Sequence, residues 1–252
     1  MDSDLVTNLR QLITGGLVLL LILLRVDAER FGAAEYDEAA RDGRAPSVRR
    51  RLAWYLLGIG LVILILFVHP APQQQLFLGS GDRLKALAFG FVYAVIGASQ
   101  AVAFAWLRYH RLRLPKVSSY PGALINAIST AFIDEAVYRG ALFGLLLATG
   151  LDVTAANVAQ ALVYVLSTRL AAPGRDRYML VLALLMGLAG GWLTAATGGI
   201  AAAFLGHAFT RFSVFLCTGH AGQVALRGRE DEDIERRRRT PEGWRVIDTH
   251  RD

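Results

Sequence analysis

This chain lacks the residues that define several common classes of protein. A single cysteine, Cys217, lies in an apolar run, which excludes a disulfide framework and a cysteine-rich zinc module. The only lysines are Lys85 and Lys116, so the last apolar run holds no Schiff-base lysine of the kind a retinal protein needs. Neither Gly-x-Ser-x-Gly surroundings nor a His-Glu-x-x-His helix is present. These gaps argue against rhomboid-type serine proteases and site-two-type zinc proteases.

Apolar residues are abundant, and their distribution is that of a membrane protein. Hydrophobic residues make up 54% of the chain, and its charged residues are crowded into short segments between apolar runs. A water-soluble domain would spread its charges over its surface. The formal net charge of +6 comes from basic residues in those short segments, so we expect a lipid bilayer and no nucleic acid as partner.

The apolar runs predict an all-α, polytopic membrane helix bundle with about seven transmembrane spans. At a rise of about 1.5 Å per residue the runs extend about 22 to 36 Å, close to the thickness of the apolar part of a bilayer. The acidic start of the chain, with Asp2 and Asp4 against Arg10, indicates a retained first helix rather than a cleaved signal peptide. The predicted spans are Leu12–Val26, Leu52–Val68, Leu84–Leu107, Ile125–Leu147, Val153–Leu170, Tyr178–Ala196 and Ile200–Thr218.

Basic residues alternate between the two sides of this bundle. Loops one, three and five and the C-terminal tail carry seven, four, three and eight of them, and the other connections carry two or fewer. Because cytoplasmic loops hold the excess of lysine and arginine, we expect an outside N-terminus and a cytosolic tail. As the location we expect a bacterial plasma membrane. Three regions follow: a three-span region with cytosolic loops at 1–120, a four-span core at 121–219, and a charged tail at 220–252.

The fourth apolar run contains three charged residues, Asp134, Glu135 and Arg139. Each ionisable side chain at the centre of a membrane helix costs about 2.5 to 3.5 kcal/mol, so these three must face protein, water or one another. Glu135 and Arg139 are four residues apart and share one helix face, where they can pair. Asp134 lies about 100° away, on the stripe that also carries Asn126 and Thr130.

Polar residues of the fifth and seventh spans lie at the same depth as this charged segment. His207 and Arg211 of the seventh span fall near the plane of Asp134 and Glu135, which predicts a shared polar chamber. Two other interpretations stay open: a structural cluster of ion pairs, and a proton relay in a transporter. The side chains that we expect to line the chamber are Asn126, Thr130, Gln160, Tyr164, Ser167, Thr168 and Thr210.

Residues from about Pro121 to Cys217 resemble the CPBP family, the intramembrane CAAX prenyl endopeptidases and bacteriocin-processing or self-immunity proteins. The likeness rests on Asp134-Glu135-Ala136-Val137-Tyr138-Arg139-Gly140, a Gly-rich helix, a Thr-Gly turn and Gly206-His207-Ala208. The family pattern is Glu-Glu-xxx-Arg, then Phe-xxx-His, then His-xxx-Asn or Asp. In that family the glutamates and histidines activate a water for peptide hydrolysis deep in the membrane, in a reaction generally described as metal-dependent.

The match of this chain to the family pattern is partial. Glu135, Arg139 and His207 match outright, whereas Asp134 replaces the first glutamate and Arg211 replaces the final asparagine or aspartate. With Tyr164 as the aromatic residue of the second motif, Thr168 stands in place of the histidine, or Ser167 after a shift of one residue. The resemblance therefore implies Asp134, Glu135, Arg139, His207 and Arg211 as the catalytic set. Asp134, Glu135 and His207 are the implied ligands of zinc or another divalent metal if the chain is active.

These departures predict a weakly proteolytic or inactive member of the family. We expect the Arg211 guanidinium to occupy the place of the metal or polarised water and to pair with Asp134 or Glu135. Such a protein would bind a membrane protein or a lipidated peptide as its client, or act as a subunit of a membrane complex. The alternatives are an active intramembrane metalloendopeptidase and a proton-coupled transporter, in which Asp134, Glu135 and His207 would relay protons.

Overall fold

Long helices make up most of the molecule. The computed structural model describes residues 3–33, 36–37, 48–109, 111–115, 117–171, 177–221 and 245–248. A continuous helical segment is built from α5 (Tyr120–Asp134), the π-helix η4 (Glu135–Leu142) and α6 (Phe143–Ala148). The other long helices are α1 (Ser3–Val26), α2 (Val48–Val68), α4 (Arg83–Tyr109), α7 (Val153–Ala171), α8 (Arg177–Thr197) and α9 (Ala201–Thr218).

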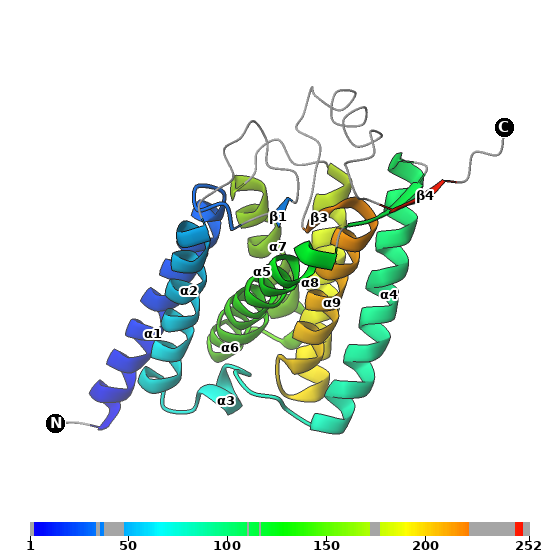
Figure 1. The fold of residues 1–252 in the computed structure, drawn as a ribbon. Coiled ribbons are helices and arrows are strands. Elements are labelled where there is room, and N and C mark those ends of the chain that lie inside the picture. Colours follow the sequence, from blue (N-terminus) through cyan, green and yellow to red (C-terminus); the bar gives the residue numbers. More distant parts are fainter. Residues whose placement is uncertain are drawn as a thin grey trace.

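Short elements complete the ordered connections. The helical turns are η1 (Asp27–Glu29), α3 (Pro72–Gln75) and η3 (Val117–Ser119). Two antiparallel strand pairs join distant segments: β1 (Tyr36–Asp37) with β3 (His220–Ala221), and β2 (Arg111–Leu114) with β4 (Arg245–Asp248). The strand pairs lie at one end of the bundle and α3 lies at the opposite end (Figure 1). The predicted charged tail at 220–252 falls largely outside the described residues.

The predicted all-α membrane bundle is confirmed, and a helix forms at each of the seven predicted spans. Within the part of the chain that the structure describes, α1, α2, α4, α8 and α9 are long and apolar enough to cross a membrane. The α5–α6 segment is not among these five helices, because it is divided into helices of 15, 8 and 6 residues. The fifth predicted span, α7, is less apolar and is not among them either. Figure 1 shows the α5–α6 segment between the α1–α2 pair and the α4–α9 pair.

Small residues bring α4 and α9 close together. A Cβ atom at Gly206 would lie 2.1 Å from Cδ1 of Tyr93, and one at Gly97 would lie 1.7 Å from Oγ1 of Thr210. Glycine at these positions therefore lets the two helices approach, as small residues do in many membrane proteins. This packing fixes the face of α9 that carries His207 and Arg211.

The connection between α2 and α4 folds back beneath the π-helix. Its Gln75 carbonyl oxygen would lie 2.1 Å from a Cβ atom at Gly144, so the chain touches α6 backbone there. Backbone hydrogen bonds also join it to the α8–α9 turn: Asp82 donates to the Thr197 carbonyl at 2.8 Å, and Ile200 donates to the Gly79 carbonyl at 3.1 Å. The connection therefore closes this end of the bundle below the charged residues.

His69 begins this connection and gives it a dependence on pH. The residue is 4% exposed, and its Nδ1 accepts a hydrogen bond from the Ala71 N–H at 3.2 Å. Burial lowers the pKa of His69 below the usual 6.5. The unfolded chain therefore takes up this proton first, and the free energy of unfolding should fall as the pH drops below about 7, where the unfolded imidazole becomes protonated.

Thermal unfolding in detergent across that pH range tests the role of His69. The wild-type melting temperature should decrease toward acidic pH. His69→Asn, which keeps a side-chain acceptor for the Ala71 N–H but does not titrate, should show a flatter profile. Parallel profiles for the two proteins would contradict the prediction.

Candidate functional site

The charged segment of the fourth predicted span forms a π-helix. This eight-residue stretch, Glu135–Leu142, follows α5 without a break, and its residues from Glu135 to Ala141 are all buried. π-helical turns are rare and are frequently found at functional sites. Here the π-helix places Glu135, Tyr138 and Arg139 among α1, α7, α8 and α9.

Glu135 is at the centre of a buried charged cluster. Its Oε1 lies 2.7 Å from Nδ1 of His207, and its Oε2 lies 3.4 Å from Nε of Arg139. The predicted pairing of Glu135 with Arg139 is therefore present, and His207 comes to the same carboxylate from α9. An ionised Glu135 only accepts hydrogen bonds, so the Nδ1–H of His207 donates to it. The other ring nitrogen of a neutral His207 then carries the lone pair.

Arg139 is fully buried beside an aromatic ring and a glycine. The centre of its guanidinium lies 4.1 Å from the centroid of the Tyr164 ring, a cation–π contact between η4 and α7. A Cβ atom at Gly190 would lie 3.2 Å from Nε of Arg139 and 3.4 Å from Oε2 of Glu135. The glycine in α8 therefore leaves room for the ion pair.

Asp134 pairs with Arg25, a residue of α1 that lay outside the predicted site. Nε of Arg25 donates to Oδ1 of Asp134 at 2.8 Å, and both side chains are buried. Trp54 of α2 supports the end of α1, because its Nε1–H donates to the carbonyl oxygen of Leu24, the residue before Arg25, at 2.8 Å. Arg25 is the last charged residue of the first apolar run, and its position inside that run is the only sequence signal for a buried role. We counted it instead with the basic residues of loop one.

The predicted pairing of Arg211 with Asp134 or Glu135 is wrong. Nη2 of Arg211 donates instead to Oδ1 of Asn126 at 3.2 Å, while Nδ2 of Asn126 donates to the Tyr55 hydroxyl at 2.7 Å. Arg25 has taken the carboxylate of Asp134, and Glu135 is bonded to His207 and Arg139. Arg211 nevertheless faces inward, with 7% of its surface exposed.

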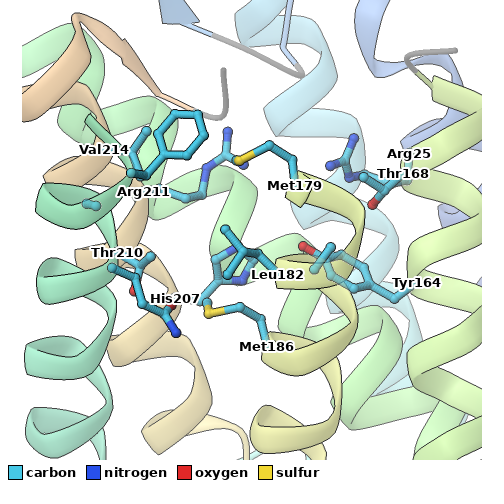
Figure 2. A pocket seen from close by; sticks show the side chains of 14 residues that line it. Arg25, Tyr164, Thr168, Met179, Leu182, Met186, His207, Thr210, Arg211 and Val214 are labelled. Carbon is cyan, nitrogen blue, oxygen red and sulfur yellow. The ribbon is translucent and has the colours of Figure 1, made fainter. Parts of the chain in front are cut away.

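A cavity of about 90 Å³ lies between α4, α7, α8 and α9, with Arg25 of α1 in its wall. Figure 2 shows Arg25 and Arg211 in this cavity, together with the imidazole of His207 and the hydroxyl of Tyr164. Of the predicted lining residues, Tyr164, Thr168 and Thr210 do line it. The full lining is Arg25, Gln100, Ala101, Phe104, Tyr164, Thr168, Met179, Leu182, Ala183, Met186, His207, Thr210, Arg211 and Val214.

The other four predicted lining residues are buried in helix contacts and do not line this cavity. Asn126 holds Arg211, and Thr130 donates to the Asn126 carbonyl of its own helix. Gln160 donates through Nε2 to the Gly187 carbonyl at 3.0 Å, which joins α7 to α8. The Ser167 and Tyr138 hydroxyls lie 2.6 Å apart, a contact between α7 and the π-helix. These polar groups stabilise the helix packing around the site.

The residues present do not fit a catalytic metal. Among the described residues no three His, Cys, Asp or Glu side chains are grouped so that they could hold a metal ion. Asp134, a member of the predicted ligand set, is bonded to Arg25, and only Glu135 and His207 come together. A catalytic zinc site generally needs three protein ligands, so the predicted set of Asp134, Glu135 and His207 is incomplete as it stands.

Comparison with known families identifies the part of the chain that carries this site. Residues 116–213 match a family model described as "Type II CAAX prenyl endopeptidase Rce1-like". The match includes all five residues of the predicted catalytic set, and it leaves α1, α2 and α4 outside. A comparison with curated protein sequences finds no match.

Proposed function

We propose that this membrane protein of the CAAX-protease type, whose residues 116–213 match the Rce1-like family model, has a role without efficient proteolysis. In this role the protein binds a membrane client in the cavity next to Glu135 and His207. The client would be a lipidated peptide or a membrane protein. The protein would lie in a bacterial plasma membrane with its tail in the cytosol, where the basic loops could join it to a larger complex.

The Arg25–Asp134 ion pair is the observation that carries this proposal. Asp134 stands where the resemblance implies the first catalytic glutamate, and a guanidinium at 2.8 Å neutralises its charge. A carboxylate held in this way is less available to a metal ion or a water, because one of its oxygens already accepts a charge-assisted hydrogen bond. Thr168, at the position of the second-motif histidine, offers only a hydroxyl, and Arg211 adds a permanent cation to the same cavity.

The Glu135–His207 pair favours a second candidate, an active endopeptidase. With Glu135 holding the Nδ1–H at 2.7 Å, the other nitrogen of the His207 ring would be the base that removes a proton from water. Glu135 would orient the imidazole and stabilise it once it is protonated. This candidate predicts that hydrolysis depends on both residues and does not need Asp134.

A cleavage assay separates the two candidates. Purified protein in nanodiscs is incubated with a farnesylated CAAX peptide, with and without added zinc, beside an active member of the same family. We expect no cleavage above that of Glu135→Gln, and we expect the fluorescently labelled peptide to bind both proteins. Turnover by the wild type that is lost in Glu135→Gln and in His207→Gln would overturn the proposal in favour of the endopeptidase.

A further inference from the structure

Thr168 has a buried hydroxyl that its own helix does not use. The residue lines the cavity and is 1% exposed, and its Oγ1 has no hydrogen-bond partner among the described residues. Serine and threonine side chains in helices often donate to the carbonyl four residues earlier. Those that do so in this chain include Thr14, Ser99, Thr130, Ser167, Thr197, Thr210 and Thr218. The Thr168 hydroxyl is therefore left to donate to a ligand or to accept from one.

Arg25 contributes a second unpaired atom to the cavity wall. Its Nε donates to Asp134, whereas its Nη1 finds no hydrogen-bond partner in the part of the chain that the structure describes, although Arg25 is only 2% exposed. Figure 2 shows Arg25 and Thr168 on the same side of the cavity. The charge of Arg25 is balanced by the carboxylate of Asp134. Its free N–H therefore needs an acceptor oxygen, and a neutral one is sufficient.

His207 offers an acceptor to the same cavity. Its Nδ1–H donates to Glu135 at 2.7 Å, so Nε2 of the neutral ring carries a lone pair. The cavity wall therefore presents a donor on Arg25, an acceptor on His207, and a hydroxyl on Thr168 that can serve as either. A peptide group has one N–H and one carbonyl oxygen, which match this combination. An anion has no N–H to donate.

The wall that α8 contributes to the cavity is apolar. Met179, Leu182 and Met186 are spaced three and four residues apart and therefore follow one face of the helix. Figure 2 shows these three side chains on α8. The volume of about 90 Å³ is several times what one water molecule needs. A ligand that combines peptide groups with apolar side chains or a hydrocarbon chain matches both kinds of wall.

We propose that Arg25 and Thr168 bind the main chain of an extended client peptide. A carbonyl oxygen of the client accepts a hydrogen bond from Nη1 of Arg25, and its N–H groups donate to Oγ1 of Thr168 and to Nε2 of His207. The inference rests on the proposed function, because it names the chemistry of the client in the same cavity. It selects a lipidated peptide over an intact transmembrane helix, since a helix already uses its N–H and carbonyl groups internally.

Arg25 lies outside the segment that matches the family model, residues 116–213. Its place in the cavity wall therefore gives α1 a part in binding the client, in addition to its ion pair with Asp134. Neither Arg25 nor α1 belongs to the motifs on which the family resemblance rests.

Binding of altered peptides tests whether the main chain is recognised. The full-length protein in phosphatidylcholine nanodiscs is titrated by calorimetry with a farnesylated CAAX peptide, with analogues in which each peptide bond in turn is an ester, and with the C-terminal carboxamide. An ester has no N–H and a weaker acceptor, so at least one analogue should bind about tenfold more weakly. The carboxamide should bind as tightly as the free acid, because no charge on the ligand is required. Mass spectrometry confirms that each peptide is intact after the titration.

Thr168→Val and Thr194→Val are a matched pair of variants. Both remove a buried hydroxyl without a hydrogen-bond partner in the described chain, but Thr194 of α8 does not line the cavity. Thr168→Val should weaken peptide binding about three- to tenfold, Thr168→Ser should restore it, and Thr194→Val should leave it unchanged. At least one ester should cost Thr168→Val less affinity than it costs the wild type, because both changes remove the same hydrogen bond.

Arg25→Lys tests the part of α1 in binding. Lysine keeps a cation beside Asp134 but has no second nitrogen for the ligand. The variant should bind the peptide about tenfold more weakly than the wild type. Its melting temperature should stay above that of Arg25→Gln, because the buried carboxylate keeps a counter-ion. The Thr168 variants and the ester analogues test the proposal even if Arg25→Lys does not fold.

Three results would overturn the inference. Equal affinities for the peptide and all its esters, or equal effects of Thr168→Val and Thr194→Val, would leave the unpaired atoms of the cavity to water. A free acid that binds much more tightly than the carboxamide would make a carboxylate the recognised group. Failure of the proposed function is a separate result: proteolysis that depends on Glu135 would refute it and leave recognition of the main chain intact, whereas a complete lack of peptide binding would refute both.

Discussion

Replacing Arg25 with glutamine should lower the free energy of unfolding by about 3 to 5 kcal/mol, the usual cost of removing one partner from a buried ion pair. The variant leaves the carboxylate of Asp134 buried with no cation at 2.8 Å, and Oδ2 of this carboxylate already has no hydrogen bond among the described residues. The glutamine side chain can donate one neutral hydrogen bond, which replaces little of the lost electrostatic attraction.

A double-mutant cycle isolates the interaction. Melting temperatures in detergent are compared for Arg25→Gln, Asp134→Asn and the double variant, with exposed Arg83→Gln as the control for loss of an arginine. The double variant should be more stable than Arg25→Gln alone, because it buries no uncompensated carboxylate. If Arg25→Gln melts at the same temperature as Arg83→Gln, the ion pair does not stabilise the fold and the structural basis of the proposed inactivity is lost.

Gly144→Ala should destabilise the protein by about 1 to 3 kcal/mol, as overpacking of a closely packed site does. Helix propensity alone predicts the opposite sign, since alanine is favoured over glycine by about 1 kcal/mol inside a helix. The difference arises because a Cβ atom at Gly144 would lie 2.1 Å from the carbonyl oxygen of Gln75, a backbone atom that cannot rotate away.

Gly60 provides the matched control for this substitution. It also lies in a helix, α2, but a Cβ atom there meets nothing within 4 Å. Gly60→Ala should therefore leave the melting temperature unchanged or raise it. A loss of stability in Gly144→Ala alone supports the contact between α6 and the α2–α4 connection, whereas equal effects in the two variants would contradict it.

The sequence was most informative where a property depends on neighbours along one helix. Apolar runs located all seven long helical segments, because burial in lipid demands long apolar stretches. The four-residue spacing of Glu135 and Arg139 correctly predicted their contact, since residues at this spacing share a helix face. The common depth of Glu135 and His207 likewise correctly brought them together.

Contacts between distant helices were harder to predict. The partner of Asp134 comes from α1, and nothing in local spacing distinguishes Arg25 from the loop arginines that follow it. Arg211 was the obvious cation by depth, yet its side chain reaches Asn126. Asp134 likewise pairs with Arg25 and does not join Glu135 and His207, because depth and spacing along the chain do not reveal which side chain holds its carboxylate. The π-helix also has no signal in the apolar pattern, which assumes a constant helical period.

The backbone contacts at the α3 end of the bundle constrain how the chain can be inserted during synthesis. The carbonyl of Gly79 receives its hydrogen bond from Ile200, which the ribosome adds far later. A nascent chain that ends before Ile200 therefore leaves this acceptor to water, and the connection between α2 and α4 stays open. We expect protease protection of that connection to arrive in a single late step, when the α8–α9 hairpin enters the bilayer.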